Sequence, residues 1–406
     1  MVLSLRLRRQ RAAPAALPLD GVRVVSLGVS ISGPLGVRHL ADFGAEVIKV
    51  EPPGGDMVRH WDSAVSGEGS VHFWVNPNKR SVVLNLKDER GRAVLRRLIA
   101  GADVFLENFS PGTAERLGFG YEEVRRLRPD IIYIHASGYG QDGPYRDMKA
   151  FDGLIQAETG VMEMTGTPES PAKVALSICD GVTGLFIALS AMMALRQRDR
   201  TGAGQEVDVS MFDCMTSMLG YFPLRHFYEG YVPERVGMGH HLLAPYGAYP
   251  AKGGKLIAVA CANEATWHRF AEAIGHVEWK DEARFRDNAS RYAHRAVLEA
   301  AFLPVLATRE REEWRQVFLD KGVPCACVNA LAEVCEHPQT RHRDLFPEVA
   351  GPYGRLRLGR FPVRFSGLAP RLAHPPKTGA DTAAVLRALG LDDKEIAALR
   401  EGGIIG

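Results

Sequence analysis

The feature that most constrains the fold is an alternation of short β-rich runs with helical stretches between residues 22 and 136. The runs 22–27 and 45–50 flank a stretch that starts with a serine N-cap candidate and ends at a glycine, as helices do. The same strand-helix-strand unit recurs over 81–109, and a further run at 131–136 follows another predicted helix. Such alternation is typical of a mainly parallel sheet flanked by helices, with ligands bound where the strands end. The sequence therefore predicts an α/β protein with a Rossmann-like large domain.

Past residue 200 the pattern changes and predicts a smaller α+β domain. A glycine turn inside the run 247–261 predicts a hairpin, and helical periodicity follows as far as residue 319. Domains of ~100 to 200 residues would divide this chain into two or three. The predicted division is a large domain over 20–210 and 340–406, a connecting segment over 211–235 and a small domain over 236–330.

Composition and charge exclude several classes of protein. The net charge of +2 is too balanced for the basic face of a nucleic-acid-binding protein, whereas small anionic ligands stay possible. No apolar run approaches the ~18 to 20 residues that cross a bilayer, so no membrane partner is expected. Residues 1–19 contain arginine and no acidic residue, which predicts a disordered arm, with an organellar transit segment as the alternative.

The six cysteines show neither the paired spacing of a disulfide framework nor that of a zinc site. A cytoplasmic protein without a metal is therefore expected. Cys325 and Cys327 are the one close pair, and their apolar neighbours predict a buried strand.

The first strand-to-helix turn argues against a nucleotide cofactor. Gly28, Gly33 and Gly36 do not match the spacing that binds a dinucleotide, which disfavours NAD. Pro34 and Leu35 stand where a P-loop needs Lys and Ser or Thr, which disfavours ATP. What remains is a helix start with free backbone N–H groups, able to receive a pantetheine amide or a phosphate.

Polar and basic side chains follow several of the predicted strands. Asn108 ends one strand and Arg116 lies in the helix that follows, while Lys79, Arg80 and Lys87 bracket another strand. Residues 137–140 form a glycine-bearing turn after a third. Each group alone indicates little, but together they favour an elongated anionic ligand.

These groups fall within a series of separated blocks that resembles the family III CoA-transferases. That family includes formyl-CoA transferase and carnitine CoA-transferase, and it shares its fold with the α-methylacyl-CoA racemases. The resemblance covers nearly the whole chain, more loosely after residue 215. Its blocks are Gly33-Pro-Leu35, 40–51, Asn78-Lys-Arg-Ser81, 107–112, 117–119, 138–144, Thr165-Gly166, 201–205 and two glycine-closed helices near the C-terminus.

The resemblance implies two subunits threaded through each other as an interlocked homodimer. It also implies that coenzyme A enters as an acyl-CoA substrate, with no tightly bound cofactor. The CoA contacts that it implies in this chain are Ile31, Ser32, Leu84, Asn85, Lys87, Asn108, Phe109, Arg116, Ser137, Gly138 and Tyr139. The chain departs from the transferases at Pro52 and Ser137, where they place a basic residue, and Arg59 or Arg80 is expected to compensate.

A stiff segment, Thr165 to Lys173, holds the carboxylate that the resemblance marks as the acyl acceptor. Prolines 168 and 171 predict an exposed bend around Glu169. A carboxylate can attack a thioester and later hold CoA as an enzyme thioester, and the resemblance assigns this role to Glu169. Asp152 is the rival, since the racemases use an aspartate at about this place. Asp152 could equally be a helix cap, and Asp180 is expected to cap the helix 185–195.

The sequence of residues 151–160 and 173–180 resembles the branch of the family that takes CoA from succinyl-CoA to small dicarboxylates such as itaconate, mesaconate, citramalate or malate. His240, His241 and Arg225 are candidate cations for the second carboxylate. The predicted function is CoA transfer from an acyl-CoA donor to a small carboxylic or dicarboxylic acid. An α-methylacyl-CoA racemase or another acyl-CoA isomerase of the same fold is the alternative, and an inactive acyl-CoA-binding protein is a third possibility.

Overall fold

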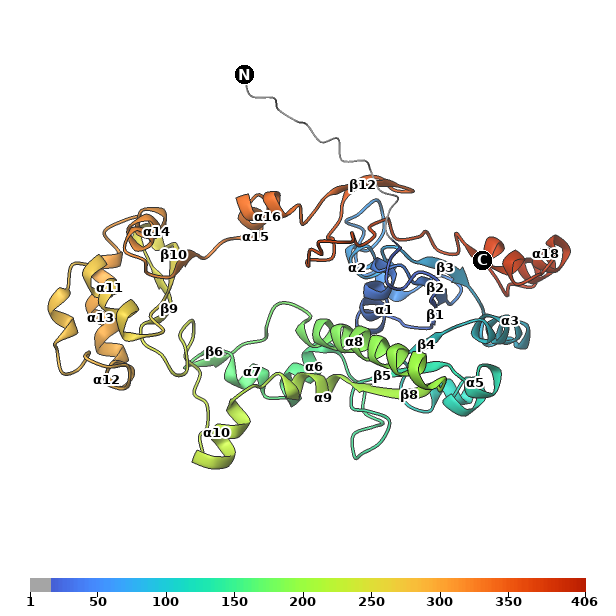
Figure 1. Ribbon diagram of the computed structural model, residues 1–406, viewed down its shortest axis with the longest axis horizontal. Helices are drawn as coiled ribbons and strands as arrows, with labels where there is room; N and C mark the ends of the chain where they lie inside the picture. The colour runs from blue at the N-terminus through green and yellow to red at the C-terminus, as the bar shows by residue number, and fades with distance from the viewer. Residues whose placement is uncertain (1–15) are drawn as a thin grey trace, which may run out of the picture. The chain divides into compact units, whose positions relative to one another are not determined.

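A computed structural model describes residues 16–406, and its chain divides into two compact units (Figure 1). Unit 1 contains the described residues up to Thr159, Leu176–Met218 and Arg341–Gly406. Unit 2 contains Gly160–Ala175 and Leu219–Thr340. The predicted arm over 1–19 lies outside the described residues as far as residue 15, and Leu19 at its end is buried.

Unit 1 is built on a six-stranded sheet in the order β3-β2-β1-β4-β5-β8, and every pair of neighbours is parallel. This confirms the predicted α/β class with a parallel sheet. The order reverses between β1 and β4, and such a reversal opens a crevice at the carboxyl ends of the two strands. The strands are β1 Arg23–Ser26, β2 Glu46–Glu51, β3 Arg80–Val83, β4 Val104–Glu107, β5 Ile132–Ser137 and β8 Gln205–Ser210.

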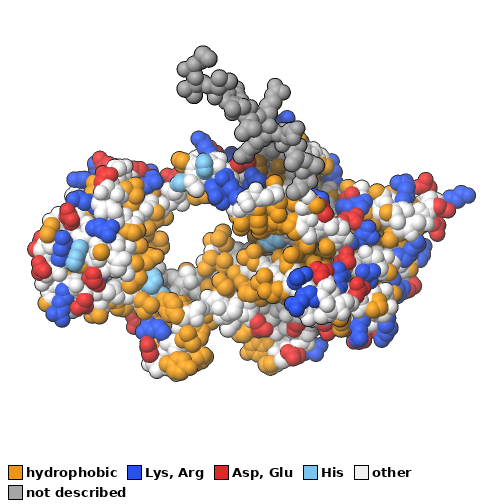
Figure 2. All heavy atoms as spheres, in the orientation of Figure 1, with side chains coloured by type: hydrophobic (Ala, Val, Ile, Leu, Met, Phe, Trp, Pro, Cys, Tyr) orange, Lys and Arg blue, Asp and Glu red, His pale blue; other side chains and the backbone are white. Residues whose placement is uncertain are grey.

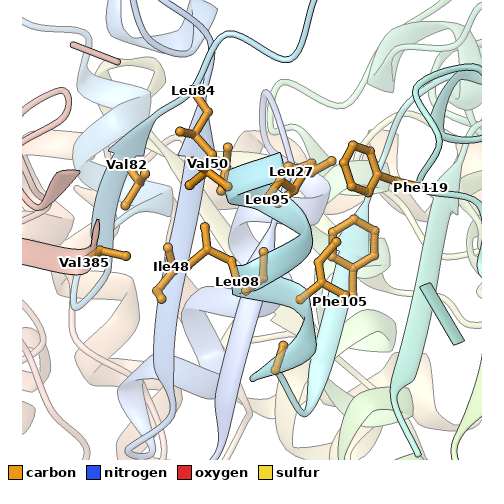
Figure 3. Packing of buried hydrophobic residues seen from close by; sticks show 14 of the residues in the cluster. Leu27, Ile48, Val50, Val82, Leu84, Leu95, Leu98, Phe105, Phe119 and Val385 are labelled. Carbon is orange, nitrogen blue, oxygen red and sulfur yellow. The ribbon is translucent and has the colours of Figure 1, made fainter. Parts of the chain in front are cut away.

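Helices cover both faces of this sheet, because successive strand residues point to opposite sides. Val24 of β1 packs in a cluster with α1 (Ser32–Asp42) and α8 (Ile178–Thr201). The next residue, Val25, belongs to a second cluster with α3 (Glu89–Ala100), α5 (Tyr121–Leu127), α17 (Thr382–Ala388) and α18 (Asp393–Glu401). Figure 3 shows side chains of the strands and of α3 gathered in this second cluster. The remaining helices of unit 1 are α2 (Ser70–Val75), α4 (Thr113–Arg116), α6 (Asp152–Glu158) and α9 (Met211–Ser217), with a 3₁₀ turn at Met57–Arg59 and a small hairpin of β12 (Glu348–Gly351) and β13 (Gly354–Arg357).

Helix α8 corrects the expectation that no apolar segment reaches the length of a membrane span. It has 24 residues, and an 18-residue window of it has a mean hydropathy of 1.8, so length and composition alone would allow a span. Ile187, Ala191 and Leu195 of α8 are buried against the sheet and α1. A core helix passes the same test of length and composition, and one face of α8 packs in the core of unit 1 while Leu185 and Met193 are exposed.

Unit 2 contains a three-stranded antiparallel sheet and a helical cluster with its own aromatic core, which includes Trp267, Phe270 and Phe318. The predicted hairpin is confirmed as β9 (Tyr246–Pro250) and β10 (Leu256–Ala260), and β11 (Cys325–Cys327) adds to its edge. The expectation of a buried strand is wrong for β11, because an edge position leaves both cysteines partly exposed. The other elements of unit 2 are α7 (Val161–Met164), β6 (Gly166–Thr167), β7 (Ser170–Pro171), α10 (Phe222–Glu229), α11 (Glu264–Ala273), α12 (Asn288–Ala293), α13 (Arg295–Leu306), α14 (Arg311–Asp320), α15 (Leu331–Cys335) and 3₁₀ turns at Lys252–Gly254 and Val277–Lys280, while α16 (Pro338–Arg343) lies at the boundary between the units.

Candidate active site

The candidate site begins at the turn between β1 and α1, which lies at the carboxyl end of the sheet beside β4. The side chain of Asn108, just after β4, crosses to this turn: the Val29 N–H donates to its Oδ1 at 2.8 Å, and its Nδ2 donates to the Val29 carbonyl at 2.9 Å. A Cβ added to Gly33 would lie 3.2 Å from the same amide, so α1 starts close against β4. Asn108 thus joins the two strands at the point where the strand order reverses.

A buried ion pair holds the turn from the other side. The Lys49 Nζ donates to the Gly28 carbonyl at 2.6 Å and to Asp56 at 2.7 Å, and both charged side chains are 1% exposed. The Ser30 N–H donates to Asp56 at 3.3 Å, and Ser30 has a positive φ of 61°. A non-glycine residue stays in this left-handed backbone conformation only when its surroundings hold it there. The backbone that enters α1 is therefore fixed before any ligand binds.

Asp180 lies in the first turn of α8, the helix that packs against α1. Its side chain is buried. Burial and the charge of Asp152 raise the pKa of Asp180 to about 6. A carboxylate so poised beside a crevice is a candidate functional group.

The expectation that Asp180 caps a helix over 185–195 is wrong, because α8 already begins at Ile178. The capping carboxylate is Asp152, the first residue of α6. Its Oδ1 accepts from the backbone N–H of Cys179 at 2.8 Å and of Asp180 at 3.3 Å, and its Oδ2 accepts from Gln156 at 2.7 Å. Asp152 thus has a structural role at the start of α8, next to Asp180.

Glu169 lies in unit 2, in the tight connection between β6 and β7. The expected exposed bend is confirmed, since residues 167–171 are exposed. A side-chain hydrogen bond from Thr167, its own backbone N–H and the charge of Arg235 lower the pKa of Glu169. Arg235 also donates to the carbonyls of Thr167 at 2.9 Å and Pro168 at 3.3 Å and pairs with Glu163, so it braces the bend.

The residues predicted to contact CoA follow the carboxyl ends of four parallel strands of unit 1. Ile31 and Ser32 follow β1. Leu84 follows β3, with its side chain buried in the core and its N–H bonded to the Glu51 carbonyl at 2.9 Å. The others are Asn85 and Lys87 after β3, Asn108, Phe109 and Arg116 after β4, and Ser137, Gly138 and Tyr139 at the end of β5. Local bonds order several of them: Asn85 accepts from the Lys87 N–H, Arg116 donates to Thr113 and Ser137 accepts from the Gly140 N–H.

The two arginines expected to compensate for Pro52 and Ser137 are engaged elsewhere. Arg59 is buried and donates to Glu51 at 2.8 Å and to Glu68 at 2.8 Å. Arg80 pairs with Glu46 and Asp381. A cation that the sequence reading missed is Lys149, whose Nζ donates to the Ser110 hydroxyl at 2.9 Å, next to Phe109. No local pattern marks Lys149, since its partner is distant in the chain.

The side chains expected to bind the second carboxylate of the acceptor acid belong to unit 2. Arg225 pairs with Glu229 at 2.9 Å and lies over the Tyr231 ring at 3.7 Å. His240 stacks on Tyr246, and its Nδ1 accepts from the Leu242 N–H. Burial, followed by nearby positive charge, lowers the pKa of both His240 and His241 below the ordinary histidine value of 6.5. At neutral pH these histidines therefore offer hydrogen bonds and not positive charge.

Comparison with known proteins gives a consistent picture. The model of "CoA-transferase family III" matches residues 19–382. The chain is 37% identical to an acetyl-CoA:oxalate CoA-transferase of Acetobacter aceti over 86% of this chain and 90% of that protein. It is 35% identical to a succinyl-CoA–D-citramalate CoA-transferase of Chloroflexus aurantiacus over 93% of each. The crystal structure of a CaiB/BaiF family protein from Brucella suis superimposes with a TM-score of 0.84 at 33% identity, over 92% of this chain and 100% of that one.

Proposed function

Because this chain belongs to CoA-transferase family III and is a CoA-transferase, we propose that it moves CoA from succinyl-CoA to a small carboxylic or dicarboxylic acid. The names of the two relatives, one for oxalate and one for citramalate, support an acceptor of this size and charge. Itaconate, mesaconate, citramalate and malate are the first acceptors to test. CoA is a substrate in this reaction, and no further cofactor is required.

The acyl-CoA lies along the carboxyl edge of the sheet in unit 1. The turn before α1, the residues after β4 and the end of β5 supply its contacts, and Lys87, Arg116 and Lys149 supply positive charge for its phosphates. A crevice at a reversal of strand order is where open parallel sheets bind ligands. Asn108 serves this site by shaping the turn, since both atoms of its amide group already bond to Val29.

The nucleophile is Asp180, and one observation carries this assignment: its carboxylate is buried at the start of α8, the helix that packs against α1. A carboxylate oxygen attacks the thioester carbonyl, the C–S bond breaks, and the CoA thiolate leaves with the electron pair. The product is a mixed anhydride. The thiolate then attacks the Asp180 carbonyl carbon and releases succinate, which leaves CoA as an enzyme thioester. The acceptor acid reverses both steps with its own carboxylate.

Glu169 and Asp152 stay as competing predictions for the same role. Glu169 is exposed and belongs to unit 2, and Asp152 uses both oxygens to hold α6 and α8. Asp180 is buried, and burial strengthens a carboxylate nucleophile because it removes solvating water.

A trapping experiment tests the assignment directly. Trypsin cleaves after Lys149, Lys173 and Arg196, so Asp180 falls in one peptide while Asp152 and Glu169 share another. The enzyme is incubated with succinyl-CoA and reduced with borohydride, which converts an acylated carboxyl group into a primary alcohol. The mass change is expected in peptide 174–196. A change confined to peptide 150–173 would refute Asp180, and the Asp180→Asn variant is the control that should show neither.

The substrates are tested by incubating the protein with succinyl-CoA and a panel of acids and following new acyl-CoA masses. New thioesters of dicarboxylic acids are expected. Deuterium at the α-carbon of a branched acyl-CoA, with no new thioester, would instead support an acyl-CoA racemase. Binding of acyl-CoA with neither product would indicate an inactive binding protein.

We also propose the interlocked homodimer and a cytoplasmic location. Exposed apolar side chains support an interface: Leu185 and Met193 on α8 are 57% and 63% exposed, and Phe227 on α10 is 73% exposed. Figure 2 shows hydrophobic side chains gathered over α10. The six cysteines, all within the described residues, are free thiols, as a reducing compartment requires. Light scattering after size-exclusion chromatography tests the dimer, which predicts twice the chain mass of 44.5 kDa.

A further inference from the structure

His135 on β5 is a buried histidine that contacts two carboxylates at once. Its Nδ1 lies 2.6 Å from Glu107 Oε1, and its Nε2 lies 2.8 Å from Glu206 Oε1. Glu107 stands opposite His135 at the end of β4, and Glu206 comes from β8 on the other side. Only 2% of His135 and 3% of Glu107 are exposed. One imidazole ring thus joins three neighbouring strands at the level where β4 ends.

Two bonds of this kind require a charged ring. An imidazole donates from both nitrogens only when it is protonated, because the neutral ring has one N–H and one acceptor nitrogen. An ionised carboxylate has only acceptor oxygens, so a neutral ring would place one lone pair against an oxygen. Burial opposes the charge on the ring, but the bonds and charges of Glu107 and Glu206 outweigh burial and raise the pKa of His135 above the ordinary value of 6.5.

The other charged groups near His135 act in the same direction. Asp208 is its register partner on β8. On β5 itself the ring of Tyr133 lies 4.4 Å from the imidazole ring, and the charges of Glu115 on α4 and Glu123 on α5 reach this tyrosine. All these acidic groups favour the imidazolium over the neutral ring.

Glu107 connects His135 to the residues that are expected to contact acyl-CoA. Its second oxygen, Oε2, accepts from the Phe109 N–H at 2.8 Å. Asn108, between the two, bonds across to Val29 with both atoms of its side-chain amide. The turn 107–109 is therefore held at two points, by the Glu107 carboxylate and by the backbone of Val29. A displacement of the Glu107 carboxylate would move both Asn108 and Phe109.

We propose that His135 is a positioning residue, whose protonated ring holds Glu107 in place and thereby fixes the Asn108–Phe109 turn for acyl-CoA. The proposal rests on the acyl-CoA site that we place at the carboxyl edge of unit 1. When His135 loses its proton, both carboxylates keep their charge. The side chain of Glu206 is 46% exposed and can turn to water, whereas that of Glu107 is 4% exposed and cannot.

The loss of the proton therefore affects Glu107 most. A buried carboxylate without a counter-charge is costly, and the cost falls only if the carboxylate moves toward water together with the turn bonded to it. Acyl-CoA binding should then weaken as the pH rises above 6.5 and passes through the pKa of His135. His135 does not touch the reacting atoms, so kcat at saturating substrate should change little.

The test measures the Kd of a stable thioether analogue of succinyl-CoA by titration calorimetry between pH 6 and pH 9.5. It compares the wild type with His135→Gln and His135→Asn. The amide nitrogen of glutamine takes the place of Nε2 and that of asparagine the place of Nδ1, so only His135→Asn keeps a donor toward Glu107.

For His135→Gln we expect the Kd at pH 6.5 to rise about tenfold, as for the loss of one hydrogen bond to a charged group. His135→Asn should lose less affinity. Both variants should lack the alkaline rise in Kd of the wild type, because neither amide titrates. The phosphates of the analogue titrate alike with every variant, so the differences between variants report on His135.

Two further variants separate this role from a simple loss of stability. Tyr133→Phe removes a buried hydrogen bond of the same strand, to the Phe119 carbonyl at 2.8 Å, and should keep the wild-type Kd at every pH even if it unfolds at a lower temperature. Glu206→Gln removes one of the two carboxylates that favour the charged ring, so its alkaline rise in Kd should begin at lower pH. Thermal unfolding of each variant measures the stability.

A wild-type Kd that stays constant over this range would overturn the proposal, as would a His135→Gln protein that binds like the wild type. Equal losses of affinity in His135→Gln and Tyr133→Phe would also overturn it, because they would show an effect of stability alone. A wild type that does not bind the analogue at any pH would refute the acyl-CoA site itself, which is a different failure from wild-type binding in His135→Gln.

Discussion

Replacing Asp180 with asparagine should make the protein more stable at neutral pH while it removes the proposed nucleophile. Burial, with help from Asp152, raises the pKa of Asp180 from 3.8 to about 6. Between these values the folded protein keeps a proton that the unfolded chain has released. Because the folded state then binds more protons, the free energy of unfolding falls as the pH rises through this window. Above pH 6 the buried carboxylate of Asp180 is charged, and it lowers the free energy of unfolding by its full amount.

The size of the effect follows from the two pKa values. One pKa unit corresponds to 1.36 kcal/mol, so the interval from 3.8 to about 6 gives about 3 kcal/mol. Asparagine has nearly the same shape as aspartate, and its amide can donate toward Asp152. The substitution therefore creates no cavity. The stability gap between Asp180→Asn and the wild type should widen by about 3 kcal/mol between pH 4 and pH 7.5.

Urea unfolding of both proteins at several pH values measures this gap, with hydrogen exchange in peptides of α8 as a local readout. Other titrating groups cancel in the difference between two proteins that share them. As a control, the same pair is compared in a protein that carries Asp152→Asn. This substitution removes the negative charge next to Asp180, so the stability gap should widen less with pH. A gap that is the same at pH 4 and pH 7.5, or one that narrows as pH rises, would refute the reasoning about Asp180.

Three further predictions concern the same site. The kcat of the wild type should fall below pH 6 as Asp180 gains a proton, and a flat profile between pH 5 and 7 would contradict its role. Asn108→Leu leaves the N–H and carbonyl of Val29 without partners and should lower the free energy of unfolding by about 1–3 kcal/mol and raise the KM for acyl-CoA. Urea unfolding and steady-state kinetics measure the two effects, and Asn108→Asp, which keeps one acceptor, should lose less. Glu169→Gln should keep turnover within about twofold of the wild type at saturating substrate, whereas a loss comparable to that of Asp180→Asn would return the nucleophile to Glu169.

The sequence was sufficient for the local elements and for the class of sheet. The alternation over 22–136 predicted five of the strands and the helices α1, α3 and α5, because strand and helix periodicities are properties of short stretches. The strand β8 was not predicted, although Val207 and Val209 alternate with charged residues along Gln205–Ser210 as in a half-buried strand. Prolines 168 and 171 likewise predicted the exposed bend around Glu169, because proline restricts the backbone of its own residue and of the one before it.

The roles of the carboxylates depended on contacts that no short stretch contains. By sequence, Asp180 was a helix cap and Asp152 a rival nucleophile, whereas in the folded chain Asp152 holds the start of α8 and Asp180 is a buried carboxylate beside it. The sequence indicated that Asn108 contacts the ligand, whereas in the structure its side-chain oxygen and nitrogen both bond to the turn after β1. The sequence thus determines which chemical groups are present and which local elements carry them. Only the tertiary structure decides which of these groups lose water and meet, because burial and hydrogen-bond distance depend on atoms from segments far apart in the chain.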